Sequence, residues 1–338
     1  MGKEKIKRAL IVGLGSIGHR HLRLLREEMP SIDILVLRSS NCSQPLPYGA
    51  QCTQDIDDAC AYKPQIAIIA SPAPFHIKIA KKLAEHGVHL LIEKPISNST
   101  QEIDTFLESC KERKVIVQTA YNLRFLNTLL HFKKEIDSRI IGKVYYIKYE
   151  VGQYLPSWRP GKDYRTTVSA QHKLGGGVLL ELSHEIDILR WVFGEIDWVS
   201  CRSTKLSNLD IDVEDCAQLN IGFSNGALGN LSMDFLRHDT TRCCTAIGEY
   251  GTIKWDAVSG QVNLFTAKLN AWQIIKNESP DRDATYREQI KSFIKAIEDG
   301  KSSTTASSGY DGLAVLKIVE AAKESSSKNS QSISIEKS

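Results

Sequence analysis

The 338-residue sequence lacks the features that mark several large classes of protein. Its net charge is only +3, far from the strongly basic balance that binding to nucleic acid or to a membrane surface requires. The apolar run at 9–12, behind a charged N-terminus, stops at a cluster of glycines. This run is too short for the hydrophobic region of a signal peptide or for a membrane span. We therefore expect a cytoplasmic protein with no nucleic-acid or membrane partner.

The eight cysteines also lack a pattern. None belongs to a CxxC pair, and no neighbouring histidine completes a zinc-binding arrangement. We therefore expect free thiols in a reducing cytosol and no metal site.

The remaining composition is that of a soluble globular protein, with 42% hydrophobic and 25% charged residues. No long repeat or low-complexity linker interrupts it. The chain is longer than one typical domain, so two domains are expected.

The N-terminal region has the pattern strand, glycine-rich turn, helix. The buried strand at 9–12 leads into Gly13-Leu14-Gly15-Ser16-Ile17-Gly18, and a helical run follows. In this context GxGxxG indicates a dinucleotide site, because the glycines allow a tight turn and a close approach to the pyrophosphate. The helix N-terminus then binds the phosphates. We predict cofactor contacts from Gly13, Gly15, Ser16, Ile17 and Gly18.

The second expected strand, at 34–37, ends in Arg38-Ser39-Ser40, where NAD-binding proteins usually have an acidic residue for the ribose. A guanidinium beside hydroxyl groups suits a 2′-phosphate. We therefore predict that Arg38 and Ser39 bind the cofactor, with NADP preferred and NAD possible. The alternative is that Arg38 only stacks on the adenine and that both cofactors bind.

Two further expected strands end in residues suited to the same crevice, because ligands of open α/β sheets bind beyond the carboxyl ends of the strands. The strand at 64–70 runs into Ser71-Pro72, and His76 follows as a crevice residue or as a substitute helix cap. The strand at 89–92 ends in Glu93-Lys94-Pro95. Proline ends this strand at a defined place and directs Lys94 toward the crevice. We predict cofactor contacts from Ser71, Pro72, His76, Glu93 and Lys94.

After Pro95, a capping box at 99–102 predicts a helix that continues to about Lys114. A last strand at 115–120 leads into the polar cluster 121–125. Alternation of strands and helices up to this point predicts a doubly wound parallel sheet in residues 1–122.

The second half has a different pattern, and we assign residues 123–325 to a second, α+β domain with a large open, mainly antiparallel sheet. Helices are expected at 178–193, 286–299 and 312–323, and a serine-rich tail at 326–338 is expected to be mobile. The expected strands lie at 144–151, 198–204, 216–223, 227–235, 243–248, 252–256 and 261–265.

The helix expected at 178–193 carries Glu181, His184 and Asp187 at a spacing of three residues, which places them on neighbouring positions of one face. His184 and Asp187 are then able to orient each other, and His184 is suited to acid–base chemistry near neutral pH. The alternative is a solvated acidic turn with a histidine packed on the sheet.

Taken together, these motifs resemble the glucose–fructose oxidoreductase/inositol dehydrogenase/MocA (Gfo/Idh/MocA) family over nearly the whole chain. The most specific of them are Glu93-Lys94-Pro95 and the triple glycine at 175–177 followed by His184 and Asp187. The resemblance implies a Rossmann domain, a substrate-binding domain, and a homodimer or homotetramer formed through the C-terminal sheet.

By position, the resemblance makes Lys94 and His184 catalytic, and Asp187 an orienting or binding residue. Many members have an aspartate four residues before the histidine. Here Leu180 takes that place, and Glu181 follows one residue later. We therefore assign Glu181 to substrate binding, together with Asn122 and Arg124 of the polar cluster.

The segment 153–165 is rich in aromatic residues, prolines and cations, and resembles that of family members associated with bacterial surface-polysaccharide and amino-sugar metabolism. Aromatic faces suit sugar rings, and arginine binds phosphate or carboxylate. We predict substrate contacts from Trp158, Arg159, Tyr164 and Arg165. A structural arm is the alternative reading of this segment.

The favoured function is an NAD(P)-dependent oxidoreductase that transfers a hydride between nicotinamide and a CH–OH group of a sugar, either nucleotide-linked or acidic. Two alternatives are a redox-neutral sugar-modifying enzyme that retains its cofactor and a non-catalytic sensor that binds a dinucleotide. Lys94 and His184 argue against the sensor, because a sensor needs no base.

Overall fold

The computed structural model describes residues 6–336, which form two compact units. The first unit runs to Asn122 and also contains Arg282–Leu313. The second comprises Leu123–Asp281 and the chain from Ala314 onward. The sequence analysis had placed 282–313 in the second domain.

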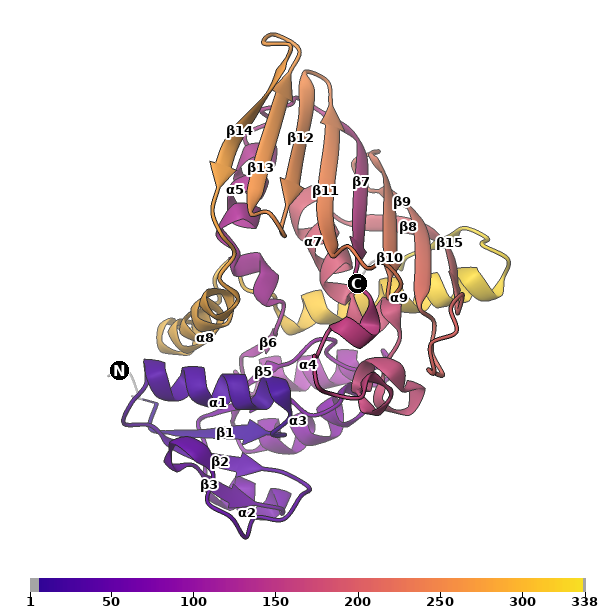
Figure 1. The fold of residues 1–338 in the computed structure, drawn as a ribbon. Helices are drawn as coiled ribbons and strands as arrows, with labels where there is room; N and C mark the ends of the chain where they lie inside the picture. The colour runs from indigo at the N-terminus through magenta and orange to yellow at the C-terminus, as the bar shows by residue number, and fades with distance from the viewer. Residues whose placement is uncertain (1–5, 337–338) are drawn as a thin grey trace. The chain divides into compact units, whose positions relative to one another are not determined.

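The first unit is built on a six-stranded parallel sheet in the order β3-β2-β1-β4-β5-β6 (Figure 1). The order reverses between β1 and β4, which is the topological switch point of a Rossmann sheet. The predicted fold class is therefore confirmed. The strands are β1 (Arg8–Val12), β2 (Asp33–Leu37), β3 (Gln51–Thr53), β4 (Ile66–Ile69), β5 (His89–Ile92) and β6 (Val117–Thr119).

The helices of this unit are α1 (Ser16–Glu28), α2 (Ile56–Ala61), α3 (His76–Glu85), α4 (Ile103–Glu112) and α8 (Arg282–Asp299). The predicted capping box is not formed. Glu102 has a left-handed backbone, with φ of 64°, and its carboxylate pairs with Lys81 at 2.6 Å, so α4 begins only at Ile103.

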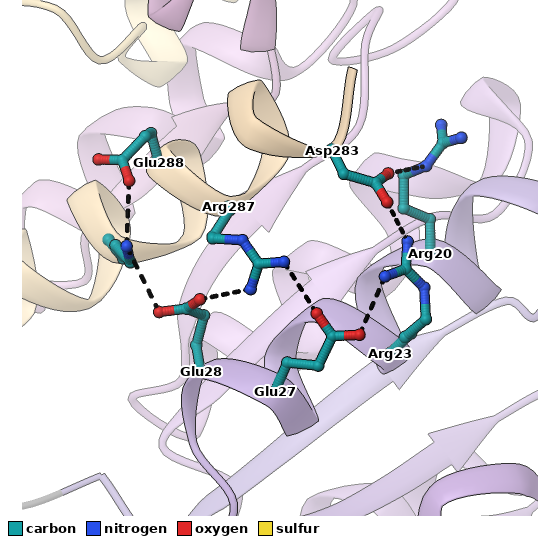
Figure 2. A network of polar contacts seen from close by, with 8 residues as sticks. Arg20, Arg23, Glu27, Glu28, Asp283, Arg287 and Glu288 are labelled. Atoms are coloured by element: carbon teal, nitrogen blue, oxygen red, sulfur yellow. Dashed lines mark hydrogen bonds and ion pairs between the residues drawn. The ribbon is translucent and has the colours of Figure 1, made fainter. Parts of the chain in front are cut away.

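Helix α8 belongs to the first unit because its apolar side chains pack in the core of that unit and its charged side chains pair with α1. Tyr286, Ile290 and Phe293 lie in the same buried core as the strands β1 and β2. Charged residues on its other positions bind α1, as Figure 2 shows: Asp283 pairs with Arg20 and Arg23, and Arg287 pairs with Glu27 and Glu28. Sequence patterns gave the helix but not these partners, which lie about 260 residues away.

The second unit contains a nine-stranded sheet in the order β14-β13-β12-β11-β7-β10-β9-β8-β15. Every neighbouring pair is antiparallel except β7 and β10, which confirms the mainly antiparallel sheet. The strands are β7 (Val144–Gly152), β8 (Ile196–Thr204), β9 (Cys216–Phe223), β10 (Leu228–Asp234), β11 (Thr241–Gly248), β12 (Gly251–Asp256), β13 (Gln261–Thr266), β14 (Ala271–Asn277) and β15 (Ile333–Ser334).

Helices α5 (Asn127–Asp137) and α7 (Ser183–Phe193) lie on one face of this sheet (Figure 1). The short helix α6 (Val178–Glu181) packs against β9 and β10. The buried aromatic residues Phe132, Phe193 and Trp255 pack between helices and sheet. Trp255 Nε1 donates to Thr128 Oγ1 at 3.0 Å, so the buried indole has a partner.

Helices α2 and α5 and strands β3 and β14 were not predicted from the sequence, and two other expectations are wrong. The helix expected at 178–193 is two helices, broken at Leu182. Helix α9 (Gly309–Ser327) and β15 order much of the tail, because β15 pairs with β8 and Ser325 Oγ accepts from the Cys201 N–H. Residues 337–338 of the predicted tail lie outside the described residues.

One expectation about the cysteines is also wrong. Cys42 and Cys52 are joined by a disulfide that closes the loop between β2 and β3, while the other six are free thiols. Burial raises the pKa of Cys110 to about 11 and that of Cys201 to about 12. Among residues 6–336, no helix is both long and apolar enough to cross a membrane.

Candidate active site

The glycine turn after β1 has the geometry that a dinucleotide requires. Gly13 has φ of +85°, and a Cβ there would lie 2.9 Å from the carbonyl oxygen of Ala70. A Cβ on Gly18 would lie 2.1 Å from the carbonyl oxygen of Gly13. Both positions therefore exclude any side chain, since backbone atoms cannot move aside as a side-chain end can.

Gly15 differs from these two glycines, because a Cβ there would meet nothing within 4 Å. Helix α1 starts directly after it at Ser16, and no side chain caps the first turn. The first backbone N–H groups of the helix are thus available to an anion, and the glycine leaves room for its close approach. Ser16 and Ile17 occupy this first turn, as predicted. The turn fits the pyrophosphate of a dinucleotide.

Ser71 and Pro72 follow β4, next to this turn. The Oγ atom of Ser71 is buried and has no hydrogen-bond partner among the described residues. An orphaned hydroxyl beside Gly13, whose Cβ would lie 2.9 Å from the Ser71 backbone nitrogen, is a second observation that fits a bound polar group.

His76 has a positioning role instead of an exposed place in the crevice. Its side chain is buried, and its ring nitrogens lie 2.6 Å from the Ser71 carbonyl oxygen and 3.1 Å from that of Pro95. It therefore connects the segments that follow β4 and β5. Burial lowers the pKa of His76, although the two carbonyl oxygens act in the opposite direction.

Arg38 follows β2, where its Nε atom donates to Ser40 Oγ at 2.5 Å. Ser39 is exposed, and its carbonyl oxygen accepts from the side chain of Gln54. The Cys42–Cys52 disulfide closes the loop that follows these residues. A guanidinium and hydroxyl groups thus lie together at the carboxyl end of β2, beside the glycine turn.

Glu93 and Lys94 follow β5, and the structure separates their roles. Lys94 is partly exposed, whereas Glu93 is 7% exposed and its Oε1 lies 2.7 Å from Nε2 of the buried His21. Glu93 therefore supports the segment from inside the unit, where the sequence had predicted cofactor contact. Asn122, predicted to bind substrate, is buried too and donates to Thr285 Oγ1 at 2.7 Å.

In the second unit, α7 carries His184 in its first turn, partly exposed. Asp187 is 1% exposed, and its two oxygens accept from Nε and Nη2 of Arg124 at 2.8 and 2.6 Å. Arg124 is 3% exposed and also lies over the ring of Trp191. This bidentate pair corrects the prediction that Arg124 binds substrate: burial makes it a support for α7.

A second buried network, missed by the sequence analysis, holds the same helix. Glu185 is fully buried and accepts from the Tyr149 hydroxyl at 2.5 Å and from Arg242 Nη2 at 2.9 Å. Burial, followed by the nearby Glu185 charge, raises the pKa of Tyr149 well above its usual value. The burial of Glu185 could not be predicted from the sequence, because a glutamate next to a candidate catalytic histidine is usually exposed to solvent.

Glu181 lies on the separate helix α6. Its Oε2 accepts from Ser169 Oγ at 2.8 Å. The break at Leu182 ends the helical spacing that was expected to place Glu181 on the same face as His184. Glu181 thus ties α6 to the preceding loop.

Side chains of the segment 153–165 line a shallow surface hollow that encloses no space of its own. Trp158 is fixed there by its Nε1 hydrogen bond to the Gln153 carbonyl and by edge contact with Phe235. Arg165 is instead exposed and held in a fork by Asp163, whose pKa the guanidinium lowers. Among the predicted residues, Trp158, Arg159 and Tyr164 line the hollow, and Lys162 joins them.

Comparison with known protein families identifies the chain. Residues 7–121 match the oxidoreductase family with an NAD-binding Rossmann fold, and residues 129–254 match the GFO/IDH/MocA C-terminal domain. The chain belongs to the Gfo/Idh/MocA family of oxidoreductases. It is therefore an oxidoreductase with an NAD-binding Rossmann domain.

Individual relatives agree with this assignment. The chain is 26% identical over 318 residues to scyllo-inositol 2-dehydrogenase (NAD(+)) of Bacillus subtilis (strain 168), covering 87% of each chain. Levoglucosan dehydrogenase in complex with NADH and L-sorbose has a TM-score of 0.85 at 20% identity, covering 98% and 99% of the two chains. The WlbA dehydrogenase from Bordetella pertussis, in complex with NADH and UDP-GlcNAcA, has a TM-score of 0.82 at 20% identity, with 99% and 100% covered. These two structural likenesses establish the fold.

Proposed function

We propose that this oxidoreductase transfers a hydride between a nicotinamide dinucleotide and a secondary alcohol or ketone of a sugar. The observation that carries the proposal is the glycine turn, with room for a ligand at Gly15 and none for a side chain at Gly13 and Gly18. Lys94 follows β5, which is separated from β1 by β4, and so stands at the carboxyl end of the same parallel sheet.

We assign the chemistry to Lys94 and His184. His184 takes the proton of the substrate hydroxyl during oxidation and returns it during reduction. The Lys94 ammonium stabilises negative charge that develops on the substrate in the transition state. When bound, the nicotinamide supplies the hydride acceptor or donor. Asp187, through its pair with Arg124, supports the helix α7 that carries His184.

Lys94→Ala and His184→Ala test these assignments. Each is expected to lower kcat at least a hundredfold against the best substrate of a sugar and nucleotide-sugar panel, because general acid–base and charge-stabilising groups contribute about 10²–10⁴-fold. In His184→Ala the affinity for NADH, measured by fluorescence titration, should change little, because only Lys94 of the two is predicted to contact the cofactor. Lys78→Ala, an exposed lysine on α3, is the matched control. Wild-type turnover in either variant would remove that residue from the mechanism.

For the substrate, we propose an acidic or nucleotide-linked sugar. Trp158 presents an aromatic side chain to the hollow, and Arg159 and Lys162 bring positive charge to it. Arg159→Ala should raise the KM of an anionic sugar about tenfold, and that of its neutral counterpart much less. Arg165→Ala is the control, because Asp163 already occupies that guanidinium. Equal KM values for both sugars would favour the structural reading of this loop.

For the cofactor, we propose that NADP is preferred. Arg38 and its neighbour Ser40 offer charge-assisted hydrogen bonds to a 2′-phosphate. NADPH should bind at least tenfold more tightly than NADH, and Arg38→Asp should reverse the preference. Equal binding of the two would mean that the protein takes both cofactors, with Arg38 confined to stacking.

The two alternatives have distinct signatures in the same assays. A redox-neutral enzyme would carry its dinucleotide through purification and convert sugar without net change in NADH absorbance. A sensor would bind NADH but turn over no member of the panel.

We also propose that the chain forms a homo-oligomer through the uncovered face of the nine-stranded sheet. Cross-strand partners there form a mostly apolar row. Leu228 pairs with Tyr146 and Tyr146 with Ile247, Thr252 follows, and Phe265 then pairs with Trp272. Leu228 and Trp272 are 50% and 54% exposed. Exposed apolar rows of this kind mark interaction sites. Tyr146→Asp should shift the mass in analytical ultracentrifugation to that of a monomer.

A further inference from the structure

His21 is a buried polar residue for which the chemistry above has no use. It lies on α1, three residues after Gly18, and its side chain is fully buried in the first unit. Its Nε2 atom lies 2.7 Å from Glu93 Oε1. The other carboxylate oxygen of Glu93 accepts from the backbone N–H of Lys94 at 3.3 Å. One carboxylate therefore joins the glycine-turn helix to the backbone of Lys94.

The hydrogen-bond partners of the His21 ring indicate which of its nitrogens carries the proton. Its Nδ1 atom is buried and has no hydrogen-bond partner within the part of the chain that the structure describes. A protonated ring would bury a second N–H donor without an acceptor, which is costly. A ring that donates through Nε2 to the Glu93 carboxylate leaves only an acceptor, Nδ1, unsatisfied. His21 is thus a fixed donor to Glu93.

The helix that carries His21 is itself anchored. Asp283 of α8 pairs with Arg20 and Arg23 on either side of His21 in the sequence (Figure 2). Tyr286 of the same helix packs its ring edge-to-face with the His21 ring at a centroid distance of 5.6 Å. His21 therefore connects a rigid pair of helices to the segment that follows β5.

We propose that His21 is a positioning residue for Lys94, acting through Glu93. The carboxylate holds the backbone from which the ammonium reaches the substrate, and His21 holds the carboxylate. This inference rests on the proposed role of Lys94. Misplacement of a catalytic group by about 1 Å is enough to lower a rate by about a hundredfold.

His21→Leu and His21→Gln test the proposal. Leucine removes the donor, whereas the Nε2 of glutamine retains one for Glu93. The first readout is the rate at which acetic anhydride modifies Lys94 in the NADH-loaded protein, followed by peptide mass spectrometry. We expect at least a fivefold faster rate in His21→Leu, because the half-buried lysine is released. His21→Gln should stay within twofold of wild type, and Lys78 serves as the internal reference.

The second readout is turnover of the best sugar of the panel. His21→Leu should lower kcat at least tenfold, with KM and the Kd of NADH within twofold of wild type. In a Lys94→Ala background the same substitution should have no further effect, because two residues that act as a unit are not additive.

Three results would overturn the proposal. The first is an unchanged Lys94 modification rate in a folded His21→Leu protein. The second is a modification rate that rises as much in His21→Gln as in His21→Leu. The third is a fall in kcat on His21→Leu substitution that is the same in the wild-type and Lys94→Ala backgrounds. If Lys94→Ala itself turns over at the wild-type rate, the proposed role of Lys94 fails and the inference fails with it. Normal turnover in His21→Leu beside an inactive Lys94→Ala would instead overturn the inference alone.

Discussion

The glycine turn of the first unit and helix α7 of the second hold their functional groups in different ways. At the turn, the backbone makes the site. Neighbouring backbone atoms leave no room for a Cβ at Gly13 or Gly18, whereas the space beside Gly15 is open. At α7, buried side-chain pairs make the site, with Asp187 bound to Arg124 and Glu185 to Tyr149. The first arrangement depends on backbone atoms, those of Gly13 against Gly18 and those of Ala70 and Ser71 against Gly13. The second depends on side chains that are 63 and 36 positions apart.

This difference gives each region its own weakness. A site made by the backbone should lose ligand affinity when a side chain is added to one of its glycines. Stability should fall as well where the new Cβ meets backbone atoms, and should not change where the space is open. A site held by buried pairs should lose stability as soon as one partner is removed, because the other is left charged or unsatisfied without water.

The largest effect is expected at the Arg124–Asp187 pair. Asp187→Asn leaves a buried guanidinium without its counter-charge, which should lower the free energy of unfolding by about 3–5 kcal/mol. Urea denaturation measures this change. Asp163→Asn, which breaks the exposed fork with Arg165, is the matched control and should change stability little. Similar losses in the two variants would contradict the role given to burial.

The next effect is expected at Gly18. In Gly18→Ala the new Cβ would press on the Gly13 carbonyl oxygen, and the resulting backbone shift should cost about 1–3 kcal/mol of stability. Thermal unfolding without cofactor measures it. An unchanged midpoint would mean that the turn relaxes freely, contrary to a site fixed by its backbone.

A smaller effect is expected from Tyr149→Phe. It removes one of the two hydrogen bonds to the Glu185 carboxylate and leaves that of Arg242, which should cost about 1–3 kcal/mol. Its measurement is again urea denaturation. If Tyr149→Phe is neutral while Asp187→Asn is not, the second network contributes nothing to holding α7.

The smallest effect is a pH dependence within the first unit. Burial lowers the pKa of His76 and His89 below the ordinary value of about 6.5. The unfolded chain therefore takes up protons first as the pH falls, so stability should be constant above about pH 7 and decline below about pH 6.5. Denaturation between pH 5 and 8 measures the slope, which His76→Gln together with His89→Gln should flatten. A slope that survives in the double variant would assign it to other groups.

The same contrast explains what the sequence predicted. The Rossmann sheet and the antiparallel sheet follow from patterns a few residues long, and both were expected. The break between α6 and α7 was not, because the apolar spacing continues across Leu182. Nor were the partners of Asp187, Asn122 and Glu93. Asp187 was expected to orient His184 or to bind, Asn122 to bind substrate and Glu93 to bind the cofactor, because they are polar residues in promising motifs. Their true partners, Arg124, Thr285 and His21, lie 63 to 163 residues away.

The most direct test of the account is a fluorescence titration of the wild-type protein and of Gly15→Ala with NADH, beside thermal unfolding of both. Because the space at Gly15 is open, the account predicts equal unfolding midpoints without cofactor but at least tenfold weaker NADH binding in the variant. Equal affinity in the two proteins would contradict the placement of the pyrophosphate at this turn. No binding of NADH or NADPH to the wild type would contradict the proposed function itself.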